Sequence, residues 1–113
     1  FIELMRDPKQ GQVSINLSRP GITKGNHYHT RKIEDFMTIY GKTSVKLREV
    51  SHVEIIEHKC DGKKPTIVHI VPPFTHDITN IGDGVSLTLM WINEVYNPEN
   101  PDTYREDVVR KQE

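Results

Sequence analysis

The chain has 113 residues, with 15 lysine and arginine side chains against 16 aspartate and glutamate side chains and no block of like charge. That length suits one domain with one modest core, and the balanced charge argues against a nucleic acid or an anionic membrane as the main partner. No apolar run approaches the roughly 20 residues of a membrane span, and no signal-peptide pattern is visible. A lone cysteine, Cys60, excludes an internal disulfide and fits a reducing compartment, so we expect a cytoplasmic protein.

Short apolar runs with the two-residue period of β-strands follow one another along the chain. After a lead-in over residues 1–10, apolar and polar residues alternate at 13–18 and again at 44–48. The runs 53–57 and 66–71 are rich in β-branched residues, and 85–92 is the most apolar stretch. Proline and glycine separate these runs, and the glycines of segment 82–84 predict a hairpin turn. The pattern predicts an all-β sandwich or barrel, followed by a short terminal helix over residues 104–112.

Two histidines and one glutamate stand close together in the first half of the chain. Residues two apart in a strand share a face, so we expect His27 and His29 side by side. The gap 30–33 is long enough for a turn that leads Glu34 into a neighbouring antiparallel strand. Two imidazoles and a carboxylate suit Zn²⁺ or Fe²⁺ and leave positions open for water or substrate. The alternative is that each histidine is an ordinary surface or core residue with its own hydrogen bond.

The spacing around these residues resembles the first motif of the cupin superfamily. That motif is matched by Gly21, five residues, His27-x-His29, four residues, Glu34, six residues and Gly41. This motif, followed downstream by the second cupin motif at residues 71–80, implies a cupin-type β-barrel (jelly-roll). We expect it to form a single domain over residues 1–113 with short N- and C-terminal extensions.

The second cupin motif, P-x-G-x-x-H-x-x-x-N, is matched in part by residues 71–80. His76 and Asn80 are in place, whereas Val71 and Pro73 replace the motif's proline and glycine, which affects the turn more than the ligand. Together the two motifs predict one metal site whose ligands are His27, His29, Glu34 and His76.

The chain also contains the stretches GQVSIN (11–16), PGITKGNH (20–27), MWINE (90–94) and NPENPDTY (97–104). These stretches resemble the C-terminal cupin domain of the CapF family of capsular polysaccharide-assembling proteins, and the resemblance covers about residues 11–104. Members of that family are bifunctional: an N-terminal reductase domain uses NADPH, and the cupin, which carries zinc, epimerises a UDP-linked 4-keto-6-deoxy amino sugar at C3. The family motif usually reads H-x-H-H, whereas Thr30 follows His29 here.

The resemblance implies that the chain is the C-terminal part of a longer reductase–cupin protein or works with a separate reductase. The opening Phe1, in place of methionine, points the same way. The implied function is C3 epimerisation of a UDP-linked 4-keto-6-deoxy-HexNAc in capsular or O-antigen polysaccharide biosynthesis. That activity would make the domain an isomerase that uses Zn²⁺, or Fe²⁺ as the alternative, and that carries no NADPH.

The chemistry requires groups that move a proton. A C3 proton next to a C4 ketone becomes acidic when a metal polarises the ketone, and a base and a proton donor must then act on opposite faces of the sugar. Lys24 is the candidate base, because it lies three residues before His27 and a desolvated lysine can lose its proton; the alternative is a solvated loop lysine. Arg31 and Lys32 are candidates for binding the nucleotide diphosphate, although an ordinary charged turn fits equally well.

Two other classes of protein fit the same motifs. A non-haem iron oxygenase uses two histidines and one carboxylate with open positions for O₂, and a sugar-binding cupin would keep the barrel without turnover. We expect a homodimer, because residues 85–92 are apolar enough to form part of an interface.

Overall fold

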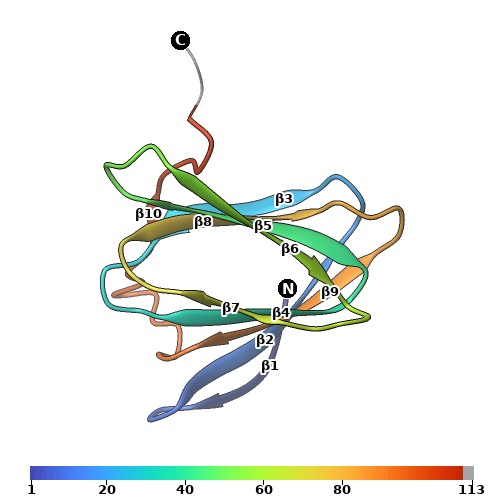
Figure 1. Ribbon diagram of the computed structural model, residues 1–113. Coiled ribbons are helices and arrows are strands. Elements are labelled where there is room, and N and C mark those ends of the chain that lie inside the picture. The colour runs from blue at the N-terminus through green and yellow to red at the C-terminus, as the bar shows by residue number, and fades with distance from the viewer. Residues whose placement is uncertain (111–113) are drawn as a thin grey trace.

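The computed structural model describes residues 1–110, a range that contains no helix and therefore none that could span a membrane. The ten strands of this range form two antiparallel five-stranded sheets that face each other (Figure 1). The first sheet has the order β1 (Ile2–Asp7), β2 (Gly11–Ser18), β9 (Ser86–Ile92), β4 (Glu34–Tyr40) and β7 (Ile67–Ile70). The second sheet has the order β10 (Tyr104–Arg105), β3 (Thr23–Tyr28), β8 (Phe74–Asn80), β5 (Lys42–Glu49) and β6 (Ile55–Asp61). The all-β prediction is confirmed.

Both ends of the chain differ from the prediction. The lead-in contains β1, which pairs with β2 along the edge of the first sheet. The predicted terminal helix is wrong over its described part, because Tyr104 and Arg105 form β10 and pair with Tyr28 and His27, and no helix follows up to residue 110. An open strand edge presents unpaired backbone groups, and β10 covers the end of the β3 edge, at His27 and Tyr28. The end of the predicted helix, residues 111–112, lies outside the described residues.

Two short connections cross between the sheets instead of forming hairpins. Segment 82–84 joins β8 of the second sheet to β9 of the first, so the predicted hairpin turn there is wrong. The predicted turn at 30–33 likewise lies in the connection from β3 to β4, residues 29–33, here called the crossing loop. Because β4 lies between β9 and β7 in the opposite sheet, Glu34 is not on a strand next to β3. A short polar gap suits a hairpin and a crossing equally, and only the pairing of the strands distinguishes them.

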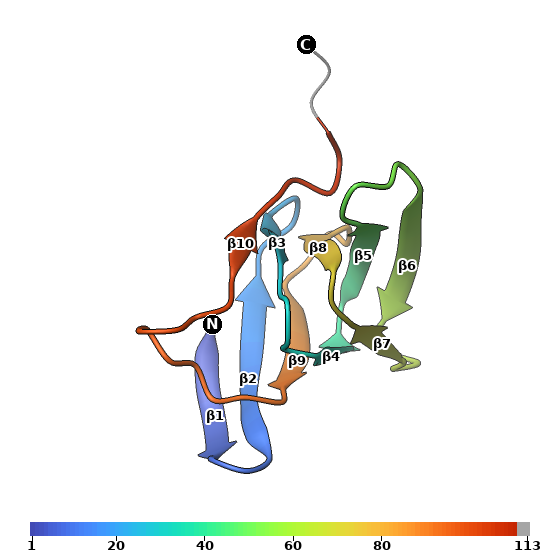
Figure 2. The ribbon, with the colours of Figure 1, turned by 90° about the vertical axis from the view of Figure 1, so that its left-hand side faces the viewer.

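The interior between the sheets has an apolar half and a polar half. The apolar core lies on β4 to β8 and consists of Phe36, Val45, Leu47, Cys60, Val68, Ile70 and Ile78. On β2 the alternation runs the other way: its polar side chains Gln12, Ser14, Asn16 and Ser18 are buried, and its apolar ones face outward. Figure 2 shows β2 and β3 on one side of the molecule and β5, β6 and β7 on the other. The polar half contains the candidate site.

Candidate metal centre

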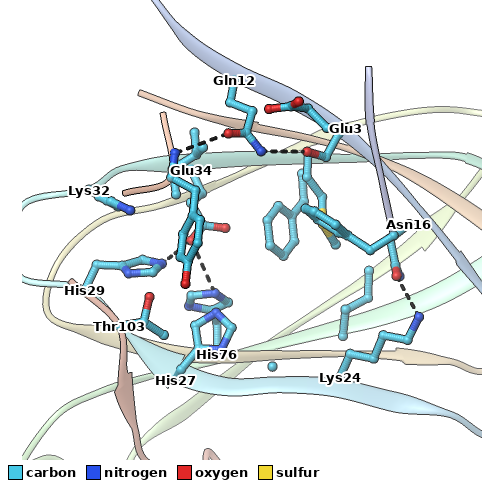
Figure 3. Close-up of a pocket in the computed structure, with 18 of the residues that line it drawn as sticks. Glu3, Gln12, Asn16, Lys24, His27, His29, Lys32, Glu34, His76 and Thr103 are labelled. Atoms are coloured by element: carbon cyan, nitrogen blue, oxygen red, sulfur yellow. Dashed lines mark hydrogen bonds and ion pairs between the residues drawn. The ribbon is translucent and has the colours of Figure 1, made fainter. Parts of the chain in front are cut away.

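The four predicted ligands meet at one point between the sheets. His27, His29, Glu34 and His76 each bring one ligand atom to within 4.8 Å of the others (Figure 3). His27 on β3 is paired with His76 on the adjacent β8, whereas Glu34 begins β4 in the opposite sheet. His29 lies just beyond the end of β3, in the segment that crosses to β4. The cluster therefore joins the two sheets.

The local shape of β3 explains how it presents two histidines to one centre. The register of β3 against β8 shifts between Gly25 and His27, which places Asn26 in a bulge with φ of 60°. Gly25 has φ of 108°, and an added Cβ would lie 2.7 Å from the carbonyl oxygen of His76, so only glycine allows this close approach. Tyr28, between the two histidines in sequence, points the other way, and its ring stacks on that of Tyr104.

His29 and Glu34 form a buried hydrogen-bonded pair through His29 Nε2 and Glu34 Oε1. Burial opposes protonation of His29, but its hydrogen bonds with Glu34 and with the Asp102 carbonyl outweigh burial and raise its pKa. For Glu34, burial opposes ionisation, but the hydrogen bond from His29 and the nearby imidazoles outweigh it and lower the pKa of the carboxyl group. Glu34 is thus held as a carboxylate.

The other two histidines are held neutral. Burial, with the neighbouring His76, lowers the pKa of His27 to about 4, and burial also lowers the pKa of His76. His76 Nε2 lies 3.7 Å from Glu34 Oε1 and has no hydrogen-bond partner among residues 1–110. Neutral imidazoles, an ionised carboxylate and a buried nitrogen without a partner are the donors that a divalent cation requires. The residues present fit such an ion.

A cavity of about 550 Å³ extends from the cluster between the sheets. Its polar wall is the inner face of β2, where Gln12 donates to the hydroxyl of Ser14 at 3.3 Å. Its apolar lining is supplied by Phe36, Ile78 and Met90, at the border with the core. The cavity offers hydroxyl and amide groups on one side and a hydrophobic surface on the other, beside the cluster.

Lys24 lies in this cavity, at the end away from His29 and Lys32 (Figure 3). Its Nζ donates to Asn16 Oδ1 at 2.8 Å and to the Leu17 carbonyl at 3.1 Å, both on β2 of the opposite sheet. Lys24 is therefore a strand residue with a bound ammonium group, which differs from the solvated loop lysine that the sequence left open.

The structure separates the two basic residues of the crossing loop. The Arg31 guanidinium donates to Glu94 Oε1 at 3.0 Å and to the Asn100 carbonyl at 3.1 Å. Donors of this side chain are therefore already bonded to the segment between β9 and β10. Lys32 is buried and lines the cavity, with its Nζ 5.7 Å from the centre of the Tyr96 ring.

Several cavity residues were not anticipated from the sequence. Gln12 and Asn16 line the polar wall, and Gln12 Oε1 also accepts from the backbone N–H of Tyr96, a further lining residue beside Thr103. The sequence of β2 could have indicated Gln12 and Asn16, because every second residue from Gln12 to Ser18 is polar and would share one face of a strand. Tyr96 and Thr103 lie in an irregular segment without periodicity, and only the folded chain brings them to the cavity.

Comparison with known proteins identifies the family of this domain. The family described as polysaccharide biosynthesis C-terminal domain matches residues 1–104. A relative from Pseudomonas aeruginosa, UDP-2-acetamido-2,6-beta-L-arabino-hexul-4-ose reductase, is 41% identical over 104 residues, which are 92% of this chain and 28% of the relative. The crystal structure of the capsular polysaccharide assembling protein CapF from Staphylococcus aureus superposes with a TM-score of 0.92 at 46% identity, over 94% of this chain and 31% of CapF.

A more distant structure shares the fold alone. QdtA, a sugar 3,4-ketoisomerase from Thermoanaerobacterium thermosaccharolyticum, has a TM-score of 0.68 at 18% identity, over 83% of this chain and 65% of QdtA. The present chain spans about a third of the length of the P. aeruginosa and S. aureus relatives. The predicted cupin-type fold and the predicted resemblance to CapF are confirmed. The chain belongs to the polysaccharide biosynthesis C-terminal domain family.

Proposed function

We propose that this domain is a metal-dependent epimerase that acts at C3 of a UDP-linked 4-keto-6-deoxy-HexNAc, in capsular or O-antigen polysaccharide biosynthesis. The observation that carries the proposal is the four-residue ligand cluster in the wall of a partly polar cavity. The P. aeruginosa relative is named for a UDP-linked acetamido hexul-4-ose, a 4-keto sugar, and the S. aureus relative for capsule assembly. The first name supports the substrate class, and the second supports the biosynthetic pathway.

A divalent cation, Zn²⁺ in our proposal, would act as a Lewis acid toward the C4 ketone when bound by His27, His29, Glu34 and His76. The chain itself supplies the surroundings. The amide and hydroxyl groups on the inner face of β2 would suit the hydroxyl and acetamido groups of an amino sugar, and the apolar side chains of Phe36 and Met90 would exclude water from one side of the sugar ring.

Inversion at C3 needs one group that removes a proton and another that returns a proton from the opposite face. We propose Lys24 as the base; to act, it must be neutral and release Asn16 or the Leu17 carbonyl. For the nucleotide diphosphate we propose Lys32, which has no ion pair with a carboxylate in the described range and lines the cavity. Arg31 can contribute only if it releases Glu94 and Asn100.

The experiment that tests the function is solvent exchange in D₂O, with metal-loaded domain, authentic 4-keto substrate and no NADPH. Mass spectrometry should show one deuterium gained at C3, and chelation or Glu34→Ala should abolish the gain. Absence of exchange would favour a sugar-binding module. Bound iron with oxygen uptake, in protein purified without added metal, would favour an iron oxygenase.

We also propose two partners and a location. A reductase, in the same longer chain or separate, would reduce C4 of the epimerised sugar, as the name of the P. aeruginosa relative suggests. A second copy of this chain would cover the outer face of the first sheet, where Val13, Ile15, Leu17, Leu87, Leu89 and Trp91 lie side by side on β2 and β9. The single buried thiol, Cys60, fits a cytoplasmic location.

A further inference from the structure

Asp102 lies outside both cupin motifs and yet is bonded to the loop that carries a ligand. It is 3% exposed, between β9 and β10. Its carboxylate accepts from the backbone N–H groups of Thr30, Arg31 and Lys32, at 2.9 to 3.2 Å, and from the Thr30 hydroxyl at 2.5 Å. These donors outweigh the effect of burial and lower the pKa of the Asp102 carboxyl group, so it stays ionised. One side chain thus fixes three consecutive residues of the crossing loop.

The backbone of Asp102 contacts the ligand itself. Its carbonyl oxygen lies 2.5 Å from His29 Nδ1, which must donate because a carbonyl can only accept. In a neutral His29 that bond would keep the ring proton on Nδ1, so that Nε2, the nitrogen that faces Glu34 and the cluster, would be the one available to a metal. Asp102 has φ of 50°, a left-handed conformation that aspartate and asparagine adopt more readily than most residues.

The residues that follow Asp102 hold the other histidine of the pair. Arg105 pairs with His27, and Tyr104 pairs with Tyr28 and stacks on its ring. The segment 102–105 therefore contacts both His27 and His29 from outside the cluster, whereas no described side chain of this segment belongs to the ligand set.

We infer that Asp102 is a positioning residue of the metal centre: its carboxylate holds the crossing loop so that its carbonyl fixes the orientation and tautomer of His29. The inference rests on the proposed metal site. It follows that metal affinity depends on a residue more than 70 positions away from the H-x-H motif, at the far end of the chain.

The test compares Co²⁺ binding to wild type, Asp102→Asn and Asp102→Ala. Affinity is measured by competition with a chromophoric chelator, ligand geometry by the visible spectrum of bound Co²⁺, and stability by the melting temperature of the metal-free proteins. Outer-shell partners of metal ligands typically contribute roughly 10- to 100-fold in affinity. We expect Asp102→Ala to weaken Co²⁺ binding by about that factor and to alter the spectrum. Asp102→Asn keeps one acceptor oxygen, so its Co²⁺ affinity should lie between those of Asp102→Ala and the wild type.

Glu106→Gln is the matched control. Glu106 directly follows segment 102–105, and its carboxylate accepts from Arg48 at 3.0 Å, whereas its side chain makes no hydrogen bond to His29 or to the crossing loop. The Glu106→Gln substitution should lower the melting temperature and leave the Co²⁺ affinity and spectrum unchanged. If Asp102→Ala fails to fold, Thr30→Ala removes the hydroxyl bond to the Asp102 carboxylate and should lower affinity by a smaller factor.

The inference would be overturned if Asp102→Ala kept the Co²⁺ affinity and spectrum of the wild type, even with a lower melting temperature. If Asp102→Ala does not fold, the same result in Thr30→Ala would overturn it. Neither result would contradict the metal centre itself. No Co²⁺ binding by the wild-type chain would overturn the metal centre and the inference together.

Discussion

The ammonium group of Lys24 is bonded across the cavity to Asn16, 2.8 Å away on the opposite sheet. If Lys24 is the base, Lys24→Ala should slow deuterium exchange at C3 by about 100-fold or more, the usual contribution of a positioned acid–base group. Asn16→Ala removes one acceptor and keeps the amine, so it should slow exchange less than tenfold by the same scale. The measurement is the initial rate of deuterium uptake in metal-loaded protein, and a loss below tenfold in Lys24→Ala would remove this residue from the role.

Metal content should be about one divalent ion per chain, because one cluster of three imidazoles and one carboxylate provides a single site. His29→Ala should lower the content sharply, as measured by elemental analysis of dialysed protein. His58→Ala is the control, since His58 is exposed on β6 and far from the cluster in the fold. Full metal retention in His29→Ala would show that His29 is not a ligand.

Removal of the metal should destabilise the domain. The cluster joins strands of both sheets, so the ion binds the folded chain in preference to the unfolded one. With free ion about 100-fold above the dissociation constant, mass action supplies about 2.7 kcal/mol, which corresponds to roughly 10 °C for a domain of this size. Differential scanning calorimetry with and without chelator measures the shift, and identical melting curves after confirmed metal loss would contradict it.

Asp77 should contribute less to the stability of the domain at neutral pH than at acidic pH. Its side chain, on the outer face of β8, is 5% exposed, and its Oδ1 has no hydrogen-bond partner in the described part of the chain. Burial raises the pKa of this carboxyl group above 3.8. The protonated form is favoured in the folded state, so this contribution is fully present below pH 3.8 and lost as the pH rises through the folded-state pKa.

Asp77→Asn should therefore raise the melting temperature at pH 7 by a few degrees, with the gain vanishing below about pH 3.8. Asp83→Asn, which changes an exposed carboxylate, should shift the melting temperature little at any pH. Thermal melts of metal-free protein between pH 3 and 8 make the comparison. A lower melting temperature for Asp77→Asn at pH 7 would mean that the charge is stabilised by a contact that compensates for burial.

The oligomeric state depends on the apolar outer face of the first sheet. Leu17 on that face is 50% exposed, and Ile55 on the second sheet is 41% exposed. In analytical ultracentrifugation, Leu17→Glu should shift a dimer toward monomer because it buries a charge at the interface, and Ile55→Glu should not. A wild-type monomer at micromolar concentration, or equal behaviour of the two variants, would rule out this interface.

The all-β class followed from the alternation of residues along the sequence, and the four clustered residues followed from the two cupin motifs that the sequence resembles. Strand periodicity depends on neighbouring residues, and the spacing of His27, His29 and Glu34 is a property of one short segment. The same information could not say that β3 and β4 belong to opposite sheets, because a four-residue gap permits either a hairpin or a crossing. It also could not show the terminal segment pairing with β3, since charged residues without periodicity carry no pairing signal.

What the sequence by itself determined is therefore the kind of strand and the identity of the donor atoms, because these depend on residue type and on separations of a few positions. What only the tertiary structure decided is which residues surround those donors. Asn16 meets Lys24, and Asp102 meets His29, across separations of 8 and 73 residues. Such contacts depend on how the two sheets pack together, and packing is a property of the whole chain that no single segment encodes.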